Sequence, residues 1–190
     1  MIVGDSSLFA IESEMSRAYA RASFRGLGFF LIHLGGMAYG VRDPSATLLA
    51  CSFDQVGVRL ESRGTHLAFF ASVPDAGKLA DAVVSAIYGP EGDDVPALGV
   101  APQQIRQILH SNGIIWAPDG DEAFDDGSCV LQFDIGRCVR VIGFRRESYR
   151  HEPSSLRDVW LEADCFYDVL RRWRSGFWDE WKAAPKEPEP

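Results

Sequence analysis

One stretch of the sequence concentrates side chains that could do chemistry. Residues 116–134, WAPDGDEAFDDGSCVLQFD, hold six carboxylates and no Lys or Arg. Five of the six lie within eight residues, at Asp119, Asp121, Glu122, Asp125 and Asp126. Carboxylates gathered in this way suit three uses, because they can bind a hard cation, act as general acid and base, or present negative charge to another molecule.

The spacing argues against a metal site. Counted from Asp119, position five of a calcium loop is Ala123, position six is Phe124 where Gly is needed, and position twelve is Val130 where a bidentate Glu is needed. Zinc has no better site, because the four histidines and four cysteines form no H-x-x-x-H or C-x-x-C pair. We therefore expect no metal and no other cofactor.

Catalysis by the acidic stretch is weakened by its polarity. Two carboxylates divide into acid and base when burial separates their pKa values, whereas crowded charges in a glycine-containing segment are typical of a solvated loop. The sequence also has no G-x-S-x-G, G-x-x-x-x-G-K-[ST] or G-x-G-x-x-G motif. A small cytoplasmic enzyme that uses residues 119–126 is the alternative that stays open.

An interaction surface is the third use. Residues 119–126 carry five negative charges and no positive charge, with Phe124 among them. An apolar anchor ringed by acids suits a basic cleft on another protein. The residues predicted to bind a partner are Asp119, Asp121, Glu122, Phe124, Asp125 and Asp126. Two other interpretations stay open, an ordinary solvated loop and internal ion pairs with the arginine-rich segment from Arg137 to Arg150.

The whole chain narrows the class of protein. A net charge of −8 argues against a general nucleic-acid binder, and suits a basic protein partner. The N-terminus is not a signal peptide and no apolar run could span a bilayer, so we expect a cytoplasmic protein without membrane contact. We expect one globular domain at residues 1–182, followed by a disordered tail at 183–190 that is rich in proline.

Two hairpins are indicated by turn residues between apolar runs. Gly35-Gly36 can make a type I′ turn that pairs Ile32 with Tyr39. Gly136-Arg137 can join 128–135 to 138–145, which pairs Cys129 with Phe144 and puts Cys129 out of register with Cys138, so we expect reduced thiols. Further short apolar runs predict strands at 8–15, 66–73 and 113–118.

Four helices are indicated by periodicity and capping residues. Ser52 and Gln55 fit a capping box ahead of a helix that ends at Gly64, although the alternation of Val56, Val58 and Leu60 keeps a strand open. Asp75 can cap a helix that ends at Gly89-Pro90, and another runs from Pro102 to Gly113.

The last predicted helix runs from about Ser155 to Trp181 with an aromatic stripe. We expect this stripe to pack on the sheet, and a groove for a partner is the alternative. Strands and helices come in blocks along the chain, rather than in strict alternation. The prediction is an α+β fold, in which a largely antiparallel sheet is packed with helices and the C-terminal helix is long and aromatic-rich.

An ordered set of segments resembles a bacterial family, immunity protein family 42 of polymorphic toxin systems. The matching segments are GDSSLFAIE (4–12), GFFLIHLGGMAYGVR (28–42), ATLLACSFDQV (46–56), WAPDGDEAFDDGSCVLQFD (116–134), VRVIGFR (139–145) and LRDVWLEADCFYDVL (156–170). The resemblance implies a protein that is not an enzyme and that binds a cognate toxin, usually by covering its active site or a surface it needs. It transfers no site residues, and the acidic stretch suggests a basic nuclease as the toxin. A protein-interaction domain unrelated to toxins is the other alternative.

Overall fold

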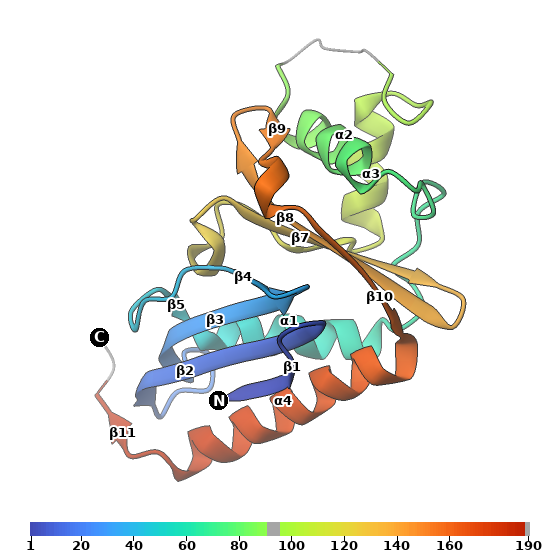
Figure 1. The fold of residues 1–190 in the computed structure, drawn as a ribbon. Helices are drawn as coiled ribbons and strands as arrows, with labels where there is room; N and C mark the ends of the chain where they lie inside the picture. The colour runs from blue at the N-terminus through green and yellow to red at the C-terminus, as the bar shows by residue number, and fades with distance from the viewer. Residues whose placement is uncertain (91–95, 189–190) are drawn as a thin grey trace.

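The computed structural model describes residues 1–90 and 96–188, which form two largely antiparallel sheets and four α-helices (Figure 1). The first sheet has the strand order β1-β2-β3-β4. Two short strands extend it, since β5 pairs with β3 and β11 pairs in parallel with β2. The strands of this sheet are β1 (Ile2–Asp5), β2 (Phe9–Tyr19), β3 (Gly26–Leu34), β4 (Met37–Tyr39), β5 (Thr47–Leu48) and β11 (Lys186–Glu187).

The second sheet has the order β10-β8-β7-β6, with the short strand β9 on β8. Its strands are β6 (Ile115–Ala117), β7 (Ser128–Ile135), β8 (Cys138–Glu147), β9 (Arg150–His151) and β10 (Arg157–Glu162). The helices are α1 (Leu49–Glu61), α2 (Ala76–Tyr88), α3 (Pro102–Ser111) and α4 (Ala163–Ala183). Figure 1 shows α1 and α4 beside the first sheet and α2 and α3 together beyond the second. The predicted α+β class is confirmed.

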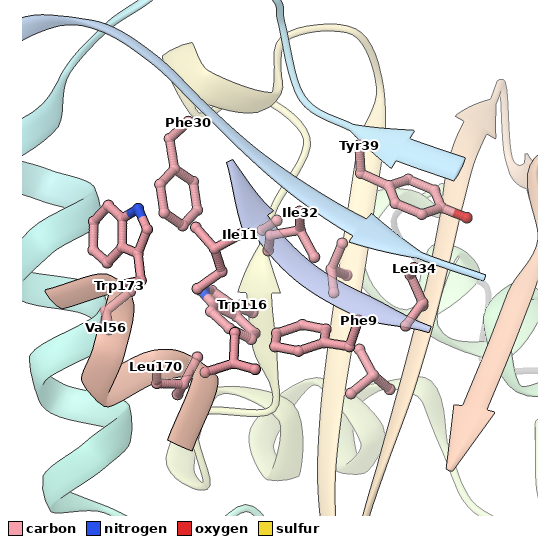
Figure 2. Close-up of a cluster of buried hydrophobic side chains, with 14 of the residues drawn as sticks. Phe9, Ile11, Phe30, Ile32, Leu34, Tyr39, Val56, Trp116, Leu170 and Trp173 are labelled. Carbon is pink, nitrogen blue, oxygen red and sulfur yellow. The ribbon is translucent and has the colours of Figure 1, made fainter. Parts of the chain in front are cut away.

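Alternation along β7 and β8 divides the interior into two cores. Val130 and Val141 face a core formed with the first sheet, α1 and α4, and Figure 2 shows Phe9, Phe30 and Trp173 within it. The opposite side chains of β7 and β8 pack against α2 and α3 in a second core. Because successive side chains of a strand point to opposite faces, one hairpin supplies both cores. No helix in the described ranges is long and apolar enough to cross a membrane.

Both predicted hairpins are confirmed. Gly35 and Gly36 adopt φ values of 55° and 80°, which a type I′ turn requires, and Ile32 pairs with Tyr39. In the second hairpin Cys129 pairs with Phe144. That register keeps Cys129 apart from Cys138, as predicted, and all four cysteines are free. The Asp75 cap and the Pro102 helix start are confirmed as well, since Asp75 accepts from the amide of Lys78 and α3 begins at Pro102.

Two predictions near the middle of the chain are wrong. The helix α1 begins at Leu49 without a side-chain cap, and Ser52 is buried inside it, so the predicted capping box does not form and neither does the alternative strand. Residues 66–73 form an irregular segment with a turn at 69–72 rather than a strand. Two backbone carbonyls of this segment accept hydrogen bonds from a side chain instead of from a neighbouring strand. The Arg140 guanidinium donates to Ala71 and Val73 at 2.7 and 2.6 Å.

The predicted start of the last helix at Ser155 is also wrong. Residues 157–162 form β10, which pairs with β8, and α4 starts only at Ala163. The open edge of β8 offers these residues a ladder, and Asp158 binds Arg140 of β8 through two hydrogen bonds of 2.9 Å. From Phe166 to Phe177 the aromatic stripe is buried as predicted, with Trp173 fully inside the first core, and Trp181 is partly buried against it.

The chain end beyond α4 is partly described. Lys186 and Glu187 pair with Ala18 and Tyr19 of β2, and the Trp181 indole donates to the carbonyl of Tyr19 at 3.0 Å. Residues 189 and 190 lie outside the described ranges. The domain at 1–182 and the disordered tail at 183–190 stay predictions.

Candidate functional site

The acidic loop at residues 118–127 joins β6 to β7 and is anchored by its apolar residues. A short 3-10 turn, η1 (Glu122–Phe124), puts Ala123 and Phe124 at 2% and 4% exposure. The Phe124 ring packs edge-on against Phe30 with centroids 6.2 Å apart, and the carbonyl of Ala123 accepts from the amide of Val41 at 2.8 Å. Phe124 therefore anchors the loop to the core, and the prediction of an exposed aromatic anchor for a partner is wrong.

Asp119 is held by an internal ion pair. Arg146 donates from Nε to Oδ2 of Asp119 at 2.5 Å, and the Asp119 side chain is only 12% exposed. The same guanidinium lies over the Tyr88 ring at 4.4 Å, and the Tyr88 hydroxyl donates to the carbonyl of Asp119 at 3.2 Å. Asp119 thus ties the loop to β8 and α2, as the interpretation of internal pairing predicted.

Asp126 is held in a similar way. Its Oδ2 pairs with Nε of Arg145 at 3.2 Å, and its Oδ1 accepts from the amide of Ser128 at 3.1 Å. Arg145 also donates to the carbonyl of Ala38 at 3.0 Å, which connects the loop to β4. The arginine-rich strand therefore neutralises two of the five acids, one at each end of the acidic run.

The three remaining acids, Asp121, Glu122 and Asp125, are exposed and form no ion pair among the described residues. Asp121 accepts from the amide of Ala123 at 3.0 Å, which caps η1 and leaves its charge uncompensated. We call these three carboxylates the acidic face. Because Ala123 and Phe124 point into the core, the acids beside them are left on the outside of the turn.

A second element, α1, lies next to the acidic face. Burial raises the pKa of the Cys51 thiol, and the negative charges of Asp121, Glu122 and Asp54 raise it further. Cys51 and Asp54 are exposed on α1. The fold brings this part of α1 near η1, since the charges of Asp121 and Glu122 act on Cys51. Sequence reasoning missed both residues, because nothing local in the sequence relates α1 to a loop so much later in the chain.

The sixth carboxylate of the opening stretch, Asp134, belongs to a buried network and not to the acidic face. Tyr167 donates to it at 2.9 Å and the amide of Gly64 at 2.8 Å. Gln132 donates to the Tyr167 hydroxyl at 2.9 Å and accepts from Arg59 at 3.1 Å. Burial raises the pKa of Tyr167 and lowers that of Arg59 to about 9. The network joins α1, β7 and α4, which is a structural role.

The geometry favours recognition over chemistry at the acidic loop. Asp121 and Glu122 are exposed to solvent and do not converge on a cavity, whereas paired catalytic carboxylates need burial to divide the roles of acid and base. Within the described ranges, no group of three or more His, Cys, Asp or Glu side chains could hold a metal ion. What the loop offers is a rigidly anchored set of uncompensated negative charges.

Comparisons with known proteins identify a family and a shared fold. The model of a family described as Immunity protein 42 matches residues 1–176. The crystal structure of CdiI from Burkholderia dolosa superimposes with a TM-score of 0.59 at 13% identity, over 93% of this chain and 99% of that one. At that identity the likeness shows a shared fold. The comparison with curated proteins finds no match.

Proposed function

Because the chain belongs to the immunity protein 42 family, we propose that it inhibits its toxin by placing the acidic face on a basic surface that the toxin needs. Membership makes the chain an immunity protein, which neutralises a cognate toxin. That role is inhibition by binding and is non-enzymatic. The proposal concerns the surface that is used and the kind of toxin that it fits.

The observation that carries the proposal is the division of the acidic loop. Arg146 and Arg145 neutralise Asp119 and Asp126, while the acidic face between them has no cation among the described residues. On a chain of net charge −8, uncompensated acids attract a positive partner and speed its association. The anchoring by Phe124 adds to this, because a preorganised loop loses little conformational freedom on binding.

We propose further that the toxin is a nuclease with a basic substrate cleft. Carboxylates on a fixed turn would occupy the positions that phosphates take in such a cleft, so binding would exclude the substrate. We place the protein in the cytoplasm, where a nuclease acts and where the four free cysteines would stay reduced.

Co-expression with the product of the adjacent upstream reading frame tests the proposal. We expect that product to arrest growth alone, and to be tolerated and co-purified when this chain is present. The complex should dissociate more readily as salt rises, because charges on the binding surface are screened. Growth arrest that persists despite full expression of a folded chain would contradict the proposal.

A further inference from the structure

A basic pocket lies between α1 and α4, beside the turn that joins β2 to β3. Its volume is about 450 Å³, and Arg25, Phe53, Arg174 and Trp178 are among the residues that line it. Arg25 comes from the β2-β3 turn, Phe53 from α1, and the other two from α4. The pocket is thus assembled from three distant parts of the chain.

Two guanidinium groups share the Phe53 ring in this pocket. The Arg25 and Arg174 guanidinium carbons lie 4.3 and 4.6 Å from the ring centroid. Arg25 pairs with Asp54 at 3.1 Å, and that carboxylate is 63% exposed. Arg174 has no ion pair and no hydrogen bond among the described residues. Two cations over one ring, of which Arg25 alone pairs with an acid among the described residues, leave a net positive site on a protein of net charge −8.

Both arginines also hold a buried nitrogen without an acceptor. The Nε atoms of Arg25 and Arg174 are shielded from solvent and have no hydrogen-bond partner. A buried donor that is left unpaired is costly, so such atoms usually find an acceptor. Guanidinium groups match carboxylates geometrically, since two parallel N–H groups can bind the two oxygens.

The backbone is shaped to hold these groups in place. Arg25 adopts φ of 50°, which a residue with a side chain rarely takes and which costs conformational energy. Gly57 lies in the middle of α1, where glycine destabilises a helix relative to alanine. A Cβ at this position would lie 3.1 Å from Nη2 and 3.2 Å from Nε of Arg174. Gly57 therefore leaves room for the Arg174 guanidinium against α1.

We propose that this pocket is a carboxylate-binding site that takes an acidic side chain of the toxin. That the bound carboxylate belongs to the toxin rests on the proposed function. The volume exceeds that of one carboxylate, so the stem of an Asp or Glu side chain can lie against Phe53 and Trp178. Asp54 connects the pocket to the acidic face, because its carboxylate pairs with Arg25 and its charge acts on Cys51 together with those of Asp121 and Glu122.

The acidic face and the arginine pocket carry opposite charges, and together they can select a toxin that neither surface could select alone. A toxin that is merely basic would meet the acidic face but would leave the arginine pocket unsatisfied. A toxin with an acidic side chain at the matching place satisfies both, and others are disfavoured by unpaired or like charges. The pocket thus fixes the orientation of the toxin and selects the cognate one.

The first test uses the free chain and a small dicarboxylate. Glutarate is titrated into labelled protein and the Nε–H signals of Arg25 and Arg174 are followed by NMR, with sodium chloride at equal ionic strength as reference. We expect saturable shifts with glutarate, and none in Arg174→Gln. Shifts that are equal in chloride, or none at all, would overturn the carboxylate site whatever the toxin does.

The second test measures affinity for the product of the adjacent reading frame. Arg174→Gln should weaken binding about 30-fold or more, because it removes one partner of a desolvated charge pair. Arg172→Gln is the matched control, since it removes the same charge from an exposed arginine of α4 that pairs with Asp168. It should change affinity less than about 3-fold. Equal effects of the two variants would overturn the role in toxin binding.

Two further variants separate binding from folding. Gly57→Ala keeps every charge but moves the Arg174 guanidinium, so it should weaken toxin binding while thermal stability is kept or raised. In a double-mutant cycle, one Asp or Glu of the toxin changed to its amide should show coupling to Arg174→Gln. If no toxin acid couples, the proposal is wrong. If the wild-type chain binds glutarate but no toxin, the proposed function fails and the carboxylate site stands.

Discussion

Removal of the Asp119 carboxylate should destabilise the fold, whereas removal of its neighbour Asp125 should not. Asp119 is 12% exposed on its side chain, and it accepts a hydrogen bond from the Arg146 guanidinium, which lies over the Tyr88 ring. Asp125 is exposed and has no ion-pair partner among the described residues. Asp126 lies between these cases, because its pair with Arg145 is one-quarter to one-third exposed.

The contacts set the expected magnitudes. A hydrogen bond to a charged group contributes about 1.5–3 kcal/mol when shielded, so Asp119→Ala should cost about 2 kcal/mol. Solvent screening weakens the ion pair of Asp126 with Arg145, so Asp126→Ala should cost about 0.5–1 kcal/mol of stability. Asp125→Ala should stay within about 0.5 kcal/mol, as surface substitutions do.

Urea denaturation measures these differences. With a slope of about 2 kcal/mol per molar, Asp119→Ala should lower the midpoint by about 1 M and leave the slope unchanged. The thermal midpoint should fall by about 4–8 °C for a chain of this size. If Asp125→Ala cost as much as Asp119→Ala, or if neither changed the midpoint, the division of the loop into structural acids and an acidic face would be refuted.

Two other properties of the chain can be predicted. Hydrogen bonds from Arg42, supported by His33 and opposed by burial, lower the pKa of Glu12 to about 2. A folded-state pKa below the unfolded value contributes stability that is fully present above about pH 4.5 and is lost as pH falls toward 2, so wild type should lose more stability over that window than Glu12→Gln in urea titrations. Equal losses would remove Glu12 as the cause. The Cys51 thiol should react faster with Ellman's reagent at pH 8 in Asp121→Asn with Glu122→Gln, because two charges that raise its pKa are gone, while Cys129, buried with a pKa of about 12, stays unreactive. Mass mapping of the labelled thiols measures both rates, and an unchanged Cys51 rate would contradict the placement of η1 beside α1.

Local patterns account for the parts of the fold that sequence could predict. Gly35-Gly36 and Gly136-Arg137 specify their turns within a few residues, and the flanking alternation specifies the register. The start of α4 failed for the opposite reason. Residues 157–162 form a strand because they pair with the open edge of β8, and because Asp158 accepts hydrogen bonds from Arg140. Both partners lie outside the segment, so its own sequence does not predict the strand.

At the candidate site, too, the sequence predicted the local features and missed those that depend on distant contacts. Sequence located the acidic loop and named Arg137 to Arg150 as competing partners, but the assignment of Asp119 and Asp126 to single arginines needed the register of β8. Phe124 was misplaced because its burial depends on Phe30, which lies far away in the sequence. The pocket of Arg25 and Arg174 has no local signal at all, since three separate segments build it.

The most direct test of the account is the affinity of the toxin for a chain with a reversed acidic face. Asp121→Lys with Asp125→Lys should slow association and weaken binding at least 10-fold at low salt, with a smaller effect at high salt. Glu162→Lys with Asp168→Lys makes the same change in net charge at the end of β10 and in α4, and it should have little effect. Equal affinity of the reversed face and the wild type, with both chains folded, would contradict the claim that these carboxylates meet the toxin.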